Sequence, residues 1–189
     1  MLSFHKKRLF FRSFFIIFGL FLAINSYAAS LSFSPATGSF TSGNVFKVSV
    51  NVDSENQAIN SAEMTVAFPG DLLEVQSVSK TNSIFSFWVQ GPSFSNTNGS
   101  IDFSGGLPTP GFNGSKGNLI DIIFKVKKSG QASLLFTPGA VRANDGLGTN
   151  VLNNIGQAIF TLGSGQQVPE TLPENVKTPS SEGAPSGSV

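Results

Sequence analysis

The chain has 189 residues and contains 19 Phe but no Cys, one His and one Tyr. The His is His5 and the Tyr is Tyr27, so the chain beyond residue 28 has neither residue. This composition excludes Ser-His-Asp and Cys-His catalysis and zinc sites built on His or Cys. The formal net charge of +1 is set by residues 1–28, which hold four basic residues and no acid. The remaining eight basic and eleven acidic residues give the rest of the chain a net charge of −3. It therefore has no excess of basic residues with which to bind nucleic acid.

The first 28 residues are typical of a secretory signal peptide. Basic residues precede an apolar run of 11 residues from Phe14 to Ile24, and Ser26 and Ala28 suit the −3 and −1 positions of a cleavage site. The alternative is an uncleaved membrane anchor, but a span needs about 20 apolar residues. We therefore expect a cleaved signal, a secreted or cell-surface protein, and a mature chain without a membrane span.

Short alternating runs predict that residues 29–162 form one all-β domain. Apolar and polar residues alternate between Gly, Pro, Asn and Ser breakers, and no window keeps a helical period. About nine strands at this spacing indicate a β-sandwich. The expected strands are Leu31–Ser34, Phe46–Val52, Ala62–Phe68, Leu73–Val78, Ile101–Ser104, Leu119–Lys127, Ala132–Thr137, Ala140–Ala143 and Gln157–Leu162.

Residues 163–189 have the composition of a linker. They are rich in Pro, Gly and Ser and hold few apolar residues, so they cannot bury enough surface to offset the entropy of ordering. Such sequence forms a semi-extended spacer. A frayed terminus without a role is the alternative, and the composition favours a linker to something outside the chain.

Several segments of the domain, taken in order, resemble cohesin domains. Residues 59–75 are similar to an early strand pair of that family, with a strand ending in an aromatic, a turn and a Leu-Glu-Val strand. Residues 99–106 and 117–127 are similar to its central hairpin strand and the long strand that follows. Residues 132–136 and 143–150 resemble its closing strands and loop.

The resemblance implies a nine-stranded jelly-roll sandwich that binds and does not catalyse. Cohesins bind dockerins, small calcium-loaded helical modules, to assemble polysaccharide-degrading or surface proteins. The calcium is accordingly expected on the partner, and no cofactor is expected in this chain. The segment Gly105–Gly117, with Pro108, Pro110 and repeated Gly, looks more like that of type II-like or solitary cohesins.

Outward residues on one sheet are the candidate partner-binding surface. The resemblance places the polar residues Ser61, Glu63 and Thr65 among the partner contacts. Alternation puts a second group on the outward face of the long strand and its neighbour: Leu119, Asp121 and Ile123 with Asp102 and Ser104. Two aliphatic residues beside an acid suit a helix-docking surface, although a central strand buried on both faces fits the same pattern. We expect Ile123→Asp and Glu63→Lys to abolish partner binding without unfolding.

Two other binding roles fit the same fold. A carbohydrate-binding module stacks sugars on Trp and Tyr rings, but only Trp88 remains after Ala28, beside Phe85 and Phe87, where a core position is favoured. Retention on insoluble cellulose or chitin would support that role. A structural or adhesive surface spacer is the other alternative, because fold alone does not fix function.

Catalysis and metal binding have weaker support in the sequence. A glycosidase needs two carboxylates about 5–9 Å apart around a cleft. Asp71 with Glu74, or Asp102 with Asp121 if their strands were adjacent, could supply them, but nothing marks a cleft. The segment 144–150 offers oxygen ligands for calcium, yet its Asn-Asp-Gly sequence is more typical of a tight turn.

Overall fold

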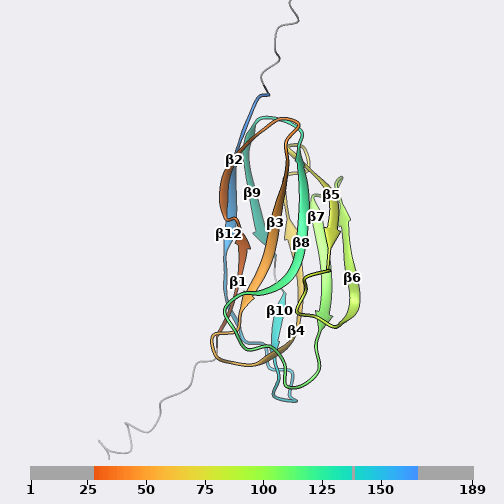
Figure 1. Cartoon of the computed structure of the whole chain (residues 1–189), viewed down its shortest axis with the longest axis vertical. Helices are drawn as coiled ribbons and strands as arrows, with labels where there is room; N and C mark the ends of the chain where they lie inside the picture. The colour runs from red at the N-terminus through yellow and green to blue at the C-terminus, as the bar shows by residue number, and fades with distance from the viewer. Residues whose placement is uncertain (1–27, 138, 166–189) are drawn as a thin grey trace, which may run out of the picture.

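A computed structural model describes residues 28–137 and 139–165, which form a sandwich of two β-sheets (Figure 1). The segments 1–27 and 166–189 lie outside the described residues, as therefore do most of the predicted signal peptide and linker. The strands are β1 (Ala29–Ser34), β2 (Thr37–Thr41), β3 (Val45–Asp53), β4 (Ile59–Ala67), β5 (Leu73–Ser79), β6 (Phe87–Ser95), β7 (Ser100–Gly106), β8 (Gly117–Val126), β9 (Gly130–Phe136), β10 (Ala140–Ala143), β11 (Leu152–Ile155) and β12 (Gln157–Gly163).

The two sheets divide the strands between them. One sheet has the order β11-β1-β3-β8-β5, and β3 and β8 lie nearest the viewer in Figure 1. The other has the order β2-β12-β9-β4-β7-β6, with β10 also paired to β4. Most pairs are antiparallel, whereas β1 with β11 and β2 with β12 are parallel. Strands β7 and β8 follow each other in the chain but belong to opposite sheets.

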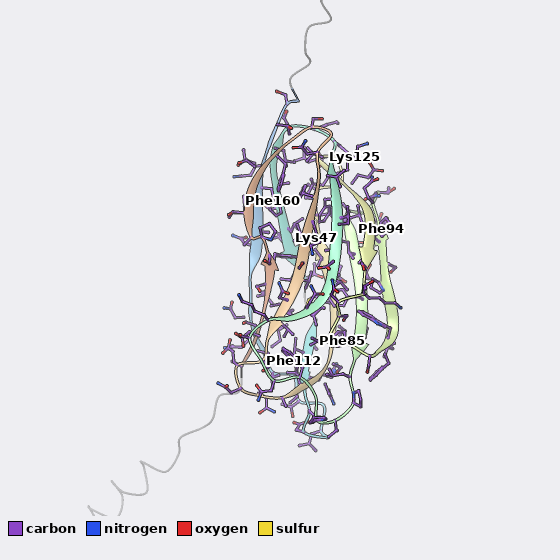
Figure 2. The ribbon with its side chains drawn as sticks, viewed as in Figure 1. Lys47, Phe85, Phe94, Phe112, Lys125 and Phe160 are labelled. Atoms are coloured by element: carbon purple, nitrogen blue, oxygen red, sulfur yellow. The ribbon has the colours of Figure 1, made fainter. Side chains whose placement is uncertain are left out.

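Phenylalanine rings join the sheets across the interior. In strands such as β3 and β9, alternate residues are buried, as expected where one face of a strand meets the core. The ring pairs that bridge the sheets are Phe40–Phe46 at 3.9 Å between centroids, Phe33–Phe136 at 4.2 Å, Phe46–Phe160 at 5.1 Å and Phe68–Phe124 at 5.4 Å. Aromatic pairs at these separations add to the area they bury, so Phe fills this core. Phe160 is labelled on β12 in Figure 2.

A β-bulge changes the alternation of β8. Asn118 pairs with Asn51 and Ile120 with Val50, which leaves Leu119 as the extra residue on β8. Leu119 and Ile120 are therefore both fully buried, and the outward positions continue at Asp121 and Ile123.

The prediction of an all-β sandwich is confirmed, with twelve strands in the described residues where about nine were expected. Each predicted segment coincides with a strand, and β2, β6 and β11 were missed. Strand β6 contains Gly91 and Pro92 and has irregular register with β7 at two places, so it lacks clean alternation. Strands β2 and β11 have five and four residues and are mostly exposed.

The ends of the described domain lie far apart. Residue 28 is at the lower end of the sandwich in Figure 1, and residue 165 is at the upper end. At the lower end the backbones of Phe112 and Ile59 exchange two hydrogen bonds of 2.8 and 2.9 Å, which fixes the β7–β8 connection against β4. Over the residues that the structure describes, no helix has the length and apolar character to cross a membrane.

Candidate functional site

The polar candidates on β4 and β7 come together on the outer face of the larger sheet. In the antiparallel register Glu63 lies opposite Ser104, and Thr65 lies opposite Asp102. Thr65 Oγ1 donates a hydrogen bond of 2.5 Å to Asp102 Oδ1. Ser61 continues the same row toward the lower end of β4, opposite Gly106. These five candidates therefore share one continuous surface.

The candidates on β8 do not belong to that surface. Strand β7 pairs with β4 and β6, and β8 pairs with β3 and β5 in the opposite sheet. The expectation that Asp102 and Ser104 lie on the neighbour of the long strand is wrong, because the chain crosses between sheets after β7. Asp102 and Asp121 are thus on opposite outer faces, and the carboxylate pair considered for glycoside cleavage is not formed.

The prediction that Leu119 lies on the outward face of β8 is also wrong. It is 0% exposed and packs in the core, since the bulge turns it inward. Ile123 does lie on the outer face of the smaller sheet and is half-buried between Lys47 of β3 and Ser77 of β5.

Asp121 lies on the outer side of β8 as predicted, but it is almost fully buried. Its Oδ1 accepts hydrogen bonds from Ser49 Oγ at 2.5 Å and Asn118 Nδ2 at 2.9 Å. Its Oδ2 accepts one from Asn82 Nδ2 at 3.3 Å and lies 3.6 Å from Lys47 Nζ. Burial alone would raise the pKa of Asp121, but these hydrogen bonds and the lysine charge outweigh it and lower the pKa. The carboxylate is engaged within the domain.

A shallow cavity of about 290 Å³ lies at the centre of the β4–β7–β6 surface. Met64, Phe103 and Gly139 complete a lining whose polar side chains are Glu63, Thr65, Gln90, Asp102 and Ser104. Gln90 comes from β6, where it pairs with Ser104. At the rim, Arg142 of β10 forms a 2.8 Å ion pair with Glu63 Oε1.

Exposed apolar residues flank this cavity on both sides. Leu135 of β9 is 46% exposed and pairs with Ala67 of β4. On the opposite side Phe87 of β6 is 50% exposed and Val89 is 80% exposed. Phe87 lies over Gly106, where an added Cβ would come within 2.7 Å of its ring. We call the outer surface of β9, β4, β7 and β6 the docking face.

Sequence reasoning missed the flanking residues of the docking face. Alternation in β9 buries Ala132, Leu134 and Phe136, so the signal for an outward Leu135 was present. Gln90 could not be placed, because the irregular register of β6 hides which of its side chains point outward. Arg142 lies in a strand that was predicted, but its partner Glu63 is 79 residues away in the chain.

Trp88 is half-buried at the edge of the sandwich. Its ring packs edge-on against Phe85 at 5.6 Å between centroids, and Lys80 Nζ lies 5.5 Å from its centre. The ring is thus part of a packed cluster, in agreement with the favoured core position and not with a flat sugar platform.

The segment 144–150 is built as a turn. Asp145 Oδ1 accepts hydrogen bonds from the backbone N–H groups of Leu147 at 2.8 Å and Gly148 at 3.1 Å. A hydrogen bond from the Thr149 side chain, with those two, lowers the pKa of Asp145. Gly146 and Gly148 take positive φ values of 74° and 71°, which suit glycine in a tight turn. Over the described ranges, no three His, Cys, Asp or Glu residues gather at metal-binding distance.

Comparison with known proteins agrees with this architecture. A family model described as the cohesin domain matches residues 31–165, whereas comparison with curated protein sequences gave no match. A type I cohesin–dockerin complex from Clostridium thermocellum has a TM-score of 0.61 at 11% identity, covering 73% of this chain and 95% of that chain.

Two further solved structures extend the likeness. The seventh ScaB type I cohesin from Pseudobacteroides cellulosolvens has a TM-score of 0.61 at 16% identity, covering 75% of this chain and 96% of that one. A non-cellulosomal cohesin from the archaeon Archaeoglobus fulgidus has a TM-score of 0.52 at 20% identity, covering 71% and 91%. At these identities the TM-scores show a shared fold alone, whereas the family match spans residues 31–165, most of the chain. The chain therefore belongs to the cohesin domain family.

Proposed function

We propose that this domain is a non-catalytic binding module that captures a dockerin through the docking face. Family membership carries the proposal, because the matched region 31–165 contains the sandwich except for the first two residues of β1. The Clostridium thermocellum structure with the same fold was solved as a cohesin–dockerin complex. The calcium of such a complex would belong to the dockerin, as the sequence resemblance implies.

The docking face has the composition of a protein interface. Interfaces favour aromatic and aliphatic residues beside a few directed polar groups. Phe87, Val89 and Leu135 supply exposed apolar area, and the cavity between them presents hydroxyl, amide and carboxylate groups. An amphipathic helix laid across these strands would meet apolar contacts at both sides and polar contacts in the middle.

The outer face of the smaller sheet lacks this combination. Its outward side chains on β1 and β3 are mainly Ser, Asn and Lys, with the exposed Val45 at the first position of β3, and Ile123 is the outward apolar residue of β8. Asp121 is held by Ser49 of β3 and by Asn82 of the connection between β5 and β6. We therefore propose Ser61, Glu63, Thr65, Asp102 and Ser104, with Phe87 and Leu135, as the partner-binding set.

Binding of recombinant dockerins from the source organism tests the proposal. Each calcium-loaded dockerin is titrated into the domain by isothermal calorimetry, with EDTA as a control. We expect at least one to bind, and we expect Leu135→Asp and Glu63→Lys to weaken binding at least tenfold. Ile123→Asp, which the sequence pattern led us to expect would abolish binding, is now the matched control. The structure places Ile123 on the opposite face, so this variant should bind as the wild type does.

Three outcomes would contradict the proposal. Failure of the wild type to bind any dockerin of the organism would overturn the function and favour the spacer role. Loss of binding in Ile123→Asp with full binding in Leu135→Asp and Glu63→Lys would move the interface to the smaller sheet. Retention of the domain on insoluble cellulose or chitin without dockerin binding would favour a carbohydrate-binding module.

We also propose that the module is exported and tethered. Residues 1–28 match a signal peptide cleaved after Ala28, and residues 163–189 match a linker. The first described strand begins at Ala29, directly after the proposed signal, and the last ends at Gly163, so the folded domain includes the first residue that the composition assigned to the linker. The likeness of Gly105–Gly117 to type II-like cohesins remains a prediction about the class of dockerin.

A further inference from the structure

We propose that the cavity at the centre of the docking face receives a lysine or arginine side chain of the dockerin. This inference rests on the proposed function and identifies the chemistry of its central contact. It starts from the charges on the larger sheet. The described strands of that sheet contain three charged residues, Glu63, Asp102 and Arg142. They therefore carry two negative charges and one positive charge.

The positive charge is already used at the rim of the cavity. Arg142 Nη2 is 2.8 Å from Glu63 Oε1, and its Nη1 donates to the Gly148 carbonyl at 3.3 Å. The guanidinium is thus held toward the 144–150 turn at the lower end of β4. Asp102 has no ion pair within the described part of the chain, and its carboxylate accepts a hydrogen bond from the Thr65 hydroxyl.

Each of the two carboxylates that line the cavity has one oxygen in a hydrogen bond or ion pair within the domain. Thr65 occupies Oδ1 of Asp102 and Arg142 occupies Oε1 of Glu63. Among the described residues, none donates a hydrogen bond to Asp102 Oδ2 or Glu63 Oε2. Both carboxylates line the same cavity as Ser104 and Gln90, which can accept further hydrogen bonds through their side-chain oxygens.

Covering this surface creates a need for positive charge. A partner seated on the docking face would remove Asp102 from water, and a buried carboxylate without a counter-charge is strongly disfavoured. A cationic side chain would offset the cost of burying Asp102 by forming an ion pair with it and donating hydrogen bonds to the neighbouring oxygens. Its apolar stem would leave the cavity toward Phe87 or Leu135, which fits the long side chains of lysine and arginine.

The first experiment removes the charge at the centre and keeps its shape. Asp102→Asn retains an oxygen for Thr65, and Glu74→Gln on β5 of the opposite sheet is the matched control. The probe is the recombinant calcium-loaded dockerin that binds the wild type most tightly. We expect Asp102→Asn to raise Kd at least tenfold and to flatten the dependence of Kd on salt, with Glu74→Gln unchanged. Thermal unfolding of each variant checks that the fold is intact.

The second experiment finds the partner residue. Each Lys and Arg of that dockerin is changed to Met in turn, and binding to the wild type and to Asp102→Asn is compared. We expect one substitution to weaken binding to the wild type at least tenfold and to have little further effect on Asp102→Asn.

The two proposals fail in different ways. If the wild type binds a dockerin but Asp102→Asn binds within twofold of it with the same salt dependence, the cavity proposal is overturned and the docking function stands. The same holds if no Lys or Arg substitution in the dockerin weakens binding, a result that does not depend on the folding of Asp102→Asn. If the wild type binds no dockerin, both proposals are overturned together.

Discussion

Asp121 shows how a residue that suggests binding can serve the fold instead. Its carboxylate accepts hydrogen bonds from β3, from β8 itself and from the segment between β5 and β6. These contacts tie a connection that crosses the edge of the sandwich to the middle of the smaller sheet. Sequence alternation correctly placed Asp121 outward, but it could not show that the side chain is almost fully covered.

The lowered pKa of Asp121 makes the stability of the domain sensitive to acid. In the folded protein the pKa lies below the ordinary value of 3.8, so the charged form favours the native state. This contribution is fully present above the unfolded pKa and is lost as pH falls through the folded one. We expect Asp121→Asn to lower the free energy of unfolding at pH 7 by about 2 kcal/mol.

Urea unfolding at neutral and acid pH measures this effect. The gap in stability between the wild type and Asp121→Asn should narrow as pH falls from about 5 to about 3. Asp71→Asn, at an exposed carboxylate in the turn before β5, is the control and should change stability by less than about 0.5 kcal/mol. A gap that stays constant with pH would show that the charge of Asp121 does not matter for folding.

Leu119 shows that the alternation of apolar and polar residues cannot predict the orientation of every side chain in a strand. From the pattern alone, Leu119, Asp121 and Ile123 share one parity and were expected on one face. One extra residue in β8 turns Leu119 into the core, while Asp121 and Ile123 stay outward. A bulge is set by pairing with β3, about 70 positions earlier in the chain, so a local pattern carries no signal for it.

At the scale of elements, the connection from β5 to β6 closes the open edge of the sandwich. Ile84 donates its backbone N–H to the Asn118 carbonyl in one sheet at 2.8 Å. Ser86 donates its backbone N–H to the Gly106 carbonyl in the other sheet at 3.0 Å. Between them Phe85 is buried and packs with Trp88 against Gly105 of β7. This edge needs a residue without a side chain at position 105.

Gly105→Ala tests that packing. An added Cβ would lie 2.6 Å from Phe85 and 3.0 Å from Trp88, and such overpacking costs about 1–3 kcal/mol. Gly91→Ala on β6 is the matched control, because no atom lies within 4 Å of its added Cβ. We expect chemical unfolding to show a loss for Gly105→Ala and almost none for Gly91→Ala. Equal stability of the two variants would contradict a tightly packed edge.

The elements were predictable to the extent that one face of each strand is buried. Strands β3, β4 and β9 alternate cleanly because they have a core side and a solvent side. Strand β6 lies at a sheet edge with two register irregularities, and its exposed aromatic residues resemble a core segment. Which strands share a sheet depends on long-range pairing. The sequence pattern therefore showed that the candidates on β4 and β7 face outward, but it placed β7 beside β8, whereas the structure pairs β7 with β4 and puts β8 in the opposite sheet.

At the scale of the whole molecule, the docking face lies along the side of the sandwich. The two ends of the domain are at its poles, with Ala29 bonded to Val151 at one end and Gly163 bonded to Ser42 at the other. The outer face of the smaller sheet points away from the docking face (Figure 1). A partner bound at the side would therefore leave both ends of the domain accessible.

Attachment of a bulky polymer at single sites can test this arrangement, because the chain has no cysteine. A maleimide polymer is coupled to Ser93→Cys on β6, Ser32→Cys on β1 or Ser164→Cys after β12, all at exposed positions. We expect the polymer at position 93, opposite Asp102, to reduce dockerin binding at least tenfold in calorimetry. The polymers at positions 32 and 164 should leave it within twofold. Blocking from position 32 alone would place the partner on the smaller sheet.

The parallel pairing of β2 with β12 has a mechanical consequence. Five consecutive residue pairs, from Thr37 with Ile159 to Thr41 with Gly163, join the strand that follows β1 to the last strand of the domain. Tension applied between residues 28 and 165 would act along these strands, across evenly spaced hydrogen bonds. A force along the strands would load those hydrogen bonds in shear, so all of them would share it. A force perpendicular to the strands, applied at one end of the pair, would break them one after another. A module with this geometry is suited to transmit force along its long axis while its side remains free.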